Sequence, residues 1–300
     1  MRLDVIGFGA LNLDKIYTVG EIAGAGQETF VESLTVSPGG SAANTIAGLA
    51  RLGSKTGYIG KLANDQEGRY LLDNLKRDGT DTSGIIISRN GRSGVCVGFV
   101  DHSGERALYI DPGVNDDLIS REVGVAYADS SQILHLTSFV GDAPFDAQRH
   151  LVKMSKKAWI SLDPGELYAK RGLLALYPIL KRTSVFLPNE KELRSMTKKG
   201  YRRGSKDLLA RGVETVAVKL AERGCYVSDG TEGYLIPAYK RKAKDTTGAG
   251  DAFCAGFLYG LLNEKDLYVC GKLGNFVASR CISEYGARNG LPSKLDVPNL

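Results

Sequence analysis

Short apolar segments alternate with amphipathic ones along most of the chain, and this alternation limits the fold more than any other feature. Repeated strand–helix units predict an α/β fold, a doubly wound and mostly parallel sheet flanked by helices on both faces. The predicted strands are LDVIGFG (3–9), KTGYIGKL (55–62), QILHLTS (132–138), AWISLDPG (158–165), TSVFLPN (183–189) and VETVAVKL (213–220), followed by a hairpin-like pair, GCYVSDG (224–230) and EGYLIPA (232–238).

Four further apolar segments interrupt the alternation, because no helical pattern separates them. They are ETFVESLTVS (28–37), TSGIIIS (82–88), SGVCVGFVD (93–101) and RALYI (106–110). We expect them to form a small β appendage from two excursions of the chain, at about 12–36 and 82–110. No repeat, low-complexity tract or Pro/Gly linker divides the rest, so residues 1–300 are predicted to form one domain.

Composition and charge exclude several classes of protein. The net charge of +5 suits anionic ligands but is too diffuse to predict nucleic-acid binding. No run of 18 apolar residues and no secretory signal is present, so we expect a cytoplasmic protein that does not bind membranes. The five cysteines include no C-x-x-C pair and the three histidines are scattered, which argues against a zinc site or a disulfide framework.

The segment KDTTGAGDAF (244–253) has the residues of an anion-binding loop at a helix start. Glycines before a helix allow a ligand to approach free backbone N–H groups, and the helix dipole favours negative charge there. Asp251 falls in the first turn of the same helix, where a carboxylate can accept a proton from a hydroxyl. Such a pairing suits phosphoryl transfer. An ordinary helix start with a first-turn acid is the alternative explanation.

Two other segments place polar side chains at helix starts. VSPGGSAANTIAGLARLG (36–53) has glycines before a helix, with Ser41 and Asn44 at its mouth. In FLPNEKEL (186–193), Asn189 and Glu192 are three residues apart. This spacing puts both side chains on one face of a helical turn, where they could hold hydrated Mg²⁺.

Together and in this order, these segments resemble the ribokinase-like (PfkB) carbohydrate and nucleoside kinase family. GGSAAN (39–44) and DTTGAGDAF (245–253) are similar to its two signatures, and the second is highly specific. The resemblance extends over essentially the whole chain through GALNLD (9–14), NDQEG (64–68), DPGVN (111–115) and YGARNGLP (285–292). It implies a ribokinase-like fold with a small β-sheet lid, transfer of the γ-phosphate of ATP to a hydroxymethyl group of a small sugar or nucleoside, and a homodimer formed through the lid.

The resemblance also implies a role for each matching residue. Asp251 is expected to be the catalytic base, and the amides of Gly248, Ala249 and Gly250 the anion hole. The acceptor is expected to bind to Asn12, Asp14, Gly39, Gly40 and Asn44. Nucleotide binding is expected to involve Asn189, Lys219, Gly224, Gly248, Gly250 and Asn275. Glu192 and Asn189 are expected to hold Mg²⁺ through water, and Asp245 and Thr246 a monovalent cation such as K⁺.

The chain departs from the family pattern at two places. KLAERG (219–224) has Ala221 where the family usually has glycine, and HLTS (135–138) lacks the acidic sugar ligand of many sugar kinases. A sugar-phosphate acceptor therefore stays an alternative, with Arg92, Arg106 and Arg288 as the candidate phosphate ligands. For a nucleoside acceptor, Phe30, Phe99 and Tyr109 are candidates for an apolar shelf under the base.

Two functions of other classes are weighed against the kinase. IGFGALN (6–12) has two glycines of a dinucleotide-binding motif but not the third, so an oxidoreductase would leave the GAGD loop unexplained. A non-catalytic nucleotide-binding regulator would have no need for Asp251. A Walker-type ATPase is excluded, because the sequence contains no G-x-x-x-x-G-K-[ST] motif.

Overall fold

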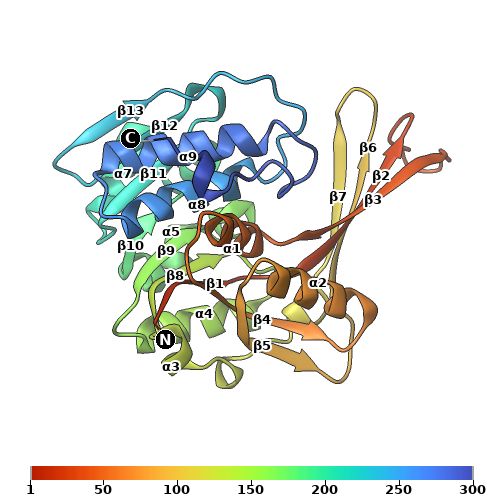
Figure 1. The fold of residues 1–300 in the computed structure, drawn as a ribbon, viewed down its shortest axis with the longest axis horizontal. Helices are drawn as coiled ribbons and strands as arrows, with labels where there is room; N and C mark the ends of the chain where they lie inside the picture. The colour runs from red at the N-terminus through yellow and green to blue at the C-terminus, as the bar shows by residue number, and fades with distance from the viewer. Residues whose placement is uncertain (1, 299–300) are drawn as a thin grey trace.

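A large twisted sheet forms the centre of the molecule in the computed structural model, which describes residues 2–298 (Figure 1). Its strand order is β13-β12-β11-β10-β9-β8-β1-β4-β5. The pairs from β11 through β5 are parallel, and β12 and β13 are antiparallel. The strands are β1 (Leu3–Phe8), β4 (Thr56–Ala63), β5 (Asp81–Ser88), β8 (Ser131–Thr137), β9 (Trp159–Asp163), β10 (Thr183–Phe186), β11 (Thr215–Lys219), β12 (Cys225–Ser228) and β13 (Gly233–Ile236).

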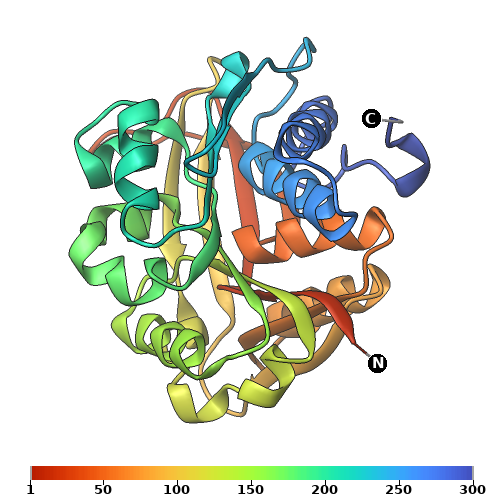
Figure 2. The ribbon, with the colours of Figure 1, turned by 90° about the vertical axis from the view of Figure 1, so that its left-hand side faces the viewer.

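Helices cover both faces of this sheet, which confirms the predicted fold class (Figure 2). One face carries α1 (Ser41–Arg51), α2 (Gln66–Arg77), α8 (Ala249–Leu262) and α9 (Leu267–Cys281); the other carries α3 (Val125–Ala128), α4 (Asp142–Met154), α5 (Gly165–Leu180), α6 (Glu190–Thr197) and α7 (Tyr201–Leu209). Neighbouring strand residues such as Ile133 and Leu134 belong to opposite cores, because side chains alternate across a strand. Both faces are therefore buried, as expected for parallel strands.

Helices α3, α5 and α7 were not predicted from the sequence. Helix α5 contains Gly172, which has non-helical backbone angles, and Pro178, so its apolar pattern is interrupted. Within residues 2–298, no helix is long and apolar enough to cross a membrane.

A second, four-stranded sheet projects from one edge of the molecule (Figure 1). Its order is β3-β2-β6-β7, with β2 (Asn12–Val19), β3 (Val31–Gly39), β6 (Gly94–Val100) and β7 (Arg106–Asp111). One predicted boundary was wrong, since residues 82–88 lie in β5 and pair with β4 in the large sheet. The reason is topological, because β4, α2 and β5 form one parallel strand–helix–strand unit. Asn12 and Asp14 lie on β2 of this small sheet.

Candidate active site

A cavity of about 370 Å³ lies where the small sheet meets the first turns of α1 and α8. This volume suits a small-molecule ligand. Its walls come from the β1–β2 link, the small sheet, the end of β8, and two helix N-termini. The lining residues are Ala10, Asn12, Asp14, Gly40, Ser41, Asn44, Cys96, Arg106, Ile110, Pro112, Asn115, Asp116, Thr137, Ser138, Val140, Leu167 and 246–251.

The loop before α8 presents free amides to this cavity. Gly248, the residue before the helix, has φ of 75°, and a Cβ built on it would lie 2.5 Å from the Cβ of Ala287. Only glycine fits this left-handed and crowded position. Within the described residues 2–298, the N–H groups of Gly250 and Asp251 have no acceptor. This helix start can therefore bind an anion.

Asp245 shapes this loop from behind. Its Oδ1 accepts hydrogen bonds from Thr247 N (2.9 Å) and Thr247 Oγ1 (2.7 Å), and its Oδ2 accepts one from Gly286 N (2.8 Å). Asp245 does not line the cavity, whereas its neighbour Thr246 does. Asp245 thus joins the anion loop to the segment after α9.

Asp251 lies in the first turn of α8 beside these amides. Asn44 Nδ2 donates to Asp251 Oδ2 (2.9 Å), and Thr45 Oγ1 donates to the Asp251 carbonyl (3.2 Å). Burial raises the pKa of the Asp251 carboxyl to about 7, although the Asn44 hydrogen bond and the charges of Lys219 and Arg288 act in the opposite direction. A carboxyl with this pKa can exchange a proton near neutral pH.

The opposite wall offers a donor and an acceptor from β2. Asp14 packs directly on Gly39, where a Cβ would lie 2.2 Å from Asp14 Oδ2. Burial raises the pKa of Asp14 to about 6, with the charge of Arg288 as a smaller opposing effect. Asn115 Nδ2 donates to Asn12 Oδ1 (3.1 Å), which leaves the Asn12 amide hydrogens for a ligand. A carboxylate beside an amide can bind neighbouring hydroxyls.

A buried ion pair lies under the anion loop. Lys219 Nζ is 2.6 Å from Asp163 Oδ2, and it is 3.5 Å from the position that a Cβ of Gly250 would take. Burial alone would lower the pKa of Lys219, but the Asp163 charge raises it above its usual range, so the amine stays charged. Sequence analysis named Lys219 and missed Asp163; the only local signal was its place at a strand end, in SLDPG (161–165).

Four predicted residues lie outside the cavity wall besides Asp245, Lys219 and Gly39. Asn189 and Glu192 form a capping box at the start of α6, where each side chain binds the other residue's backbone N–H. Asn275 donates to the carbonyls of Ile236 and Pro237, and so ties α9 to the end of β13. Gly224 closes a tight turn with Ala221 (N–O 2.9 Å). Asn189, Glu192, Asn275 and Gly224 therefore have structural contacts that explain them.

Ala221, the departure from the family pattern, has φ of 53°. This left-handed conformation is one that glycine adopts without strain and alanine does not. The turn between β11 and β12 is therefore built as it would be for glycine. Among residues 2–298, no group of three or more histidine, cysteine or carboxylate side chains is arranged to hold a metal ion.

The three candidate arginines have different environments. Arg106 lines the cavity. Arg92 is exposed and paired with Asp111 (2.6 Å), and Arg288 is buried behind Asn44, so neither lines the cavity. The expectation that all three reach the site holds only for Arg106.

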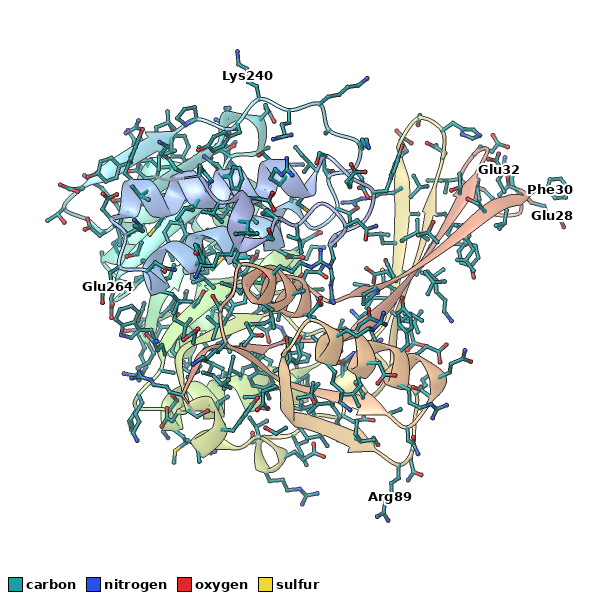
Figure 3. The ribbon with its side chains drawn as sticks, viewed as in Figure 1. Glu28, Phe30, Glu32, Arg89, Lys240 and Glu264 are labelled. Atoms are coloured by element: carbon teal, nitrogen blue, oxygen red, sulfur yellow. The ribbon has the colours of Figure 1, made fainter. Side chains whose placement is uncertain are left out.

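The aromatic residues proposed as a shelf do not reach the cavity. Phe99 and Tyr109 contact each other (ring centroids 6.4 Å apart) on the face opposite to Cys96 and Ile110, because side chains alternate along β6 and β7. Phe30 is 90% exposed at the tip of the small sheet (Figure 3). The apolar surface of the small sheet that lines the cavity comes instead from Ile110.

Asp251→Asn is expected to stabilise the protein more at pH 8 than at pH 5. Folding raises the pKa of Asp251 from 3.8 to about 7, so between these values the folded protein binds more protons than the unfolded chain, and stability falls as pH rises. Asparagine removes this loss of stability. The gain in unfolding free energy caused by Asp251→Asn should therefore be larger at pH 8 than at pH 5, by on the order of 1–3 kcal/mol. Urea unfolding measures it, with Asp73→Asn on the exposed side of α2 as the control. Equal effects of Asp251→Asn at both pH values would contradict the prediction.

Comparisons with known proteins agree with this geometry. The family described as pfkB family carbohydrate kinase matches residues 3–294. An uncharacterized sugar kinase of Archaeoglobus fulgidus is 45% identical over 252 residues, which cover 83% of this chain and 100% of that protein. An ATP-dependent ribose-1-phosphate kinase of Halopiger xanaduensis is 30% identical over 287 residues, covering 95% and 94%. The crystal structure of a ribokinase from Thermotoga maritima superposes with a TM-score of 0.88 at 25% identity, covering 98% and 97%. The chain belongs to the pfkB family of carbohydrate kinases.

Proposed function

We propose that the chain transfers the γ-phosphate of ATP to a hydroxymethyl group of a small sugar or sugar-like acceptor, with Asp251 as the base. The observation that carries this proposal is the pairing of a carboxyl of pKa about 7 with the free amides of Gly250 and Asp251 in one cavity. Family membership sets aside the oxidoreductase and the non-catalytic regulator.

In the proposed reaction, the acceptor lies between β2 and the first turn of α8. Asn12 and Asp14 bind its hydroxyls and direct one hydroxyl at Asp251. Asp251 takes the proton as the hydroxyl oxygen attacks the γ-phosphorus, and the bond from this phosphorus to the bridging oxygen breaks to release ADP. The amides of Gly248, Gly250 and Asp251 stabilise the charge on the moving phosphoryl group. The predicted contribution of the Ala249 amide is wrong, because this N–H already donates to the Thr246 carbonyl (3.2 Å). Lys219, under this loop, adds positive charge. The small sheet acts as a lid that excludes water during transfer.

Two cations belong to the same proposal. Mg²⁺ neutralises phosphate charge when it is bound, and Asn189 and Glu192 are the candidates to hold it through water. Burial and the Asp163 charge raise the pKa of Glu192 to about 7, an environment that a cation would relieve. A monovalent cation such as K⁺ beside Asp245 and Thr246 would hold the anion loop in place. Turnover that does not respond to KCl at constant ionic strength would remove K⁺ from the proposal.

The outer face of the small sheet supports a homodimer. Leu34 and Val36 of β3 are 49% and 42% exposed and lie in register with Tyr17 and Lys15 of β2. Tyr109 of β7, on the same face, is 64% exposed. We propose that a second copy covers this apolar face; a monomeric mass by light scattering at micromolar concentration would contradict it.

The acceptor has two candidate classes, unphosphorylated sugars or nucleosides and sugar phosphates. Asp14 favours an uncharged acceptor, because a carboxylate repels phosphate. Arg106 on the same wall favours a phosphorylated acceptor, as does the similarity to a ribose-1-phosphate kinase. The pKa of Asp14, about 6, moderates the repulsion, because part of this carboxyl is neutral near pH 6.

Asp251→Asn is expected to lower kcat by about 10²–10⁴, the usual contribution of a positioned general base. ATP affinity should change little, because asparagine has the same shape and the loop amides remain. Single-turnover assays and ATP titration measure the two quantities. A variant that turns over at nearly the wild-type rate would show that Asp251 is not the base.

Arg106→Ala separates the acceptor classes when ADP release is measured with ribose, fructose, adenosine, cytidine, ribose 1-phosphate and fructose 1-phosphate. For an unphosphorylated acceptor we expect little change. For a sugar phosphate, loss of one charged hydrogen-bond partner should lower kcat/KM by about 10–100-fold. Arg92→Ala is the matched control, because Arg92 lies just before β6, pairs with Asp111 of β7 and does not line the cavity. Strong turnover of phosphorylated acceptors alone would reject the first class.

A further inference from the structure

Arg288 is a buried cation that the proposed reaction does not use. It lies in the segment after α9, and its side chain is 7% exposed. Its Nε donates to Asn44 Oδ1 (2.8 Å), and its carbonyl accepts from Arg51 Nη1 (2.5 Å). It lies behind Asn44, which lines the cavity. A charged group is rarely buried so completely without a specific partner.

The contacts of Arg288 indicate a role at the candidate active site rather than a purely structural link to α2. The nearest carboxylate to Nη1 is Asp78 at 3.8 Å, which is too long for a hydrogen bond, and Nη1 has no other partner among the described residues. An arginine that served only to tie the C-terminal segment to α2 would be expected to bind Asp78 through two short hydrogen bonds. The short side-chain hydrogen bond goes to Asn44 instead.

This hydrogen bond determines which way the Asn44 amide faces. An asparagine side chain has one acceptor oxygen and one donor NH₂ group. The arginine Nε can only donate, so it must face the Asn44 oxygen, and the NH₂ group then faces Asp251 Oδ2 (2.9 Å). The reversed amide would place two donors together and its oxygen against a carboxylate. Arg288 therefore keeps Asn44 as a donor to Asp251.

A fixed donor on Oδ2 favours the ionised form of Asp251 and leaves Oδ1 for the acceptor hydroxyl. The permanent charge of Arg288 acts in the same direction, because a guanidinium does not lose its proton in proteins. The ionisable and charged groups that face Asp251 come from several elements. They are Asp163 at the end of β9, Lys219 of β11, Tyr58 of β4, Cys254 in α8, Cys281 in α9 and Arg288.

We propose that Arg288 is a positioning residue for phosphoryl transfer, which holds Asp251 ionised and correctly hydrogen-bonded through the amide of Asn44. This inference rests on the proposed function, because it assumes that Asp251 is the base. It assigns Arg288 a place behind the acceptor site rather than in contact with the acceptor.

The test compares pH profiles of kcat for the wild type, Arg288→Met and Arg51→Met. Arg288→Met keeps the length of the side chain but removes the Nε donor and the charge. We expect kcat at pH 7 to fall about 10-fold and the acidic limb to move up by about one pH unit, as for loss of a charged neighbour. Arg51→Met removes the contact with the Arg288 carbonyl and leaves Asn44 untouched. Its acidic limb should stay at the wild-type pH.

Two results would overturn the inference: an unchanged acidic limb in folded Arg288→Met, or the same shift in Arg51→Met. If Arg288→Met does not fold, Arg288→Lys keeps the charge and loses the Nε geometry. We then expect kcat to fall about 3–10-fold, with a smaller upward shift of the acidic limb than in Arg288→Met because the charge is kept. A wild-type kcat in Arg288→Lys would reject the role of the amide. In an Asn44→Leu background, Arg288→Lys should lower kcat little further, because the two residues act through one contact. A full additional loss of kcat in the double variant would also reject the inference.

Asp251→Asn, measured in parallel, separates this inference from the proposed function. If Asp251→Asn remains active, the base assignment fails and the inference fails with it. If Asp251→Asn is inactive while Arg288→Met behaves like the wild type, only the inference about Arg288 fails.

Discussion

The contact between the first turns of α1 and α8 is the interaction on which the whole site depends. Asn44 and Thr45 of α1 bind the carboxylate and the carbonyl of Asp251, which is more than 200 residues away in the sequence. The helices approach closely because Gly48 faces Ala255, where a Cβ would lie only 2.8 Å from the Ala255 Cβ. Both N-termini therefore open onto one cavity, and their partial positive charges act on the same ligand.

The fold around the site also buries carboxyl groups that would be more stable in water. Burial raises the pKa of Asp14 to about 6 and those of Asp251 and Glu192 to about 7. The charge of Arg288 opposes this rise for Asp14 and Asp251, whereas that of Lys219 is offset by its partner Asp163. Such an arrangement is unfavourable for folding and useful for proton transfer, and the two apolar cores on either side of the large sheet must offset it.

The two faces of the small sheet have different surroundings, because side chains alternate along its strands. Asp14, Cys96, Arg106 and Ile110 face the cavity. The aromatic rings of Tyr17, Phe99 and Tyr109 contact one another on the opposite face. Neighbouring residues in one strand belong to different faces of this sheet. A substitution that alters the cavity wall therefore leaves the outer face unchanged, and a substitution on the outer face leaves the cavity wall unchanged.

The sequence by itself determined the α/β layering, the anion loop and the acid beside it. These features depend on residues close together in the chain, where periodicity and a glycine before a helix have a direct physical meaning. It could not separate a metal pair from a capping box at Asn189 and Glu192, because both need the same spacing of three residues. Only the tertiary structure shows that the capping contacts form, because it places each side chain against the other residue's N–H. The pairing of Asp163 with Lys219 and that of Arg288 with Asn44 could not be predicted from the sequence, because these partners lie 56 and 244 residues apart and meet only when the sheet and helices pack.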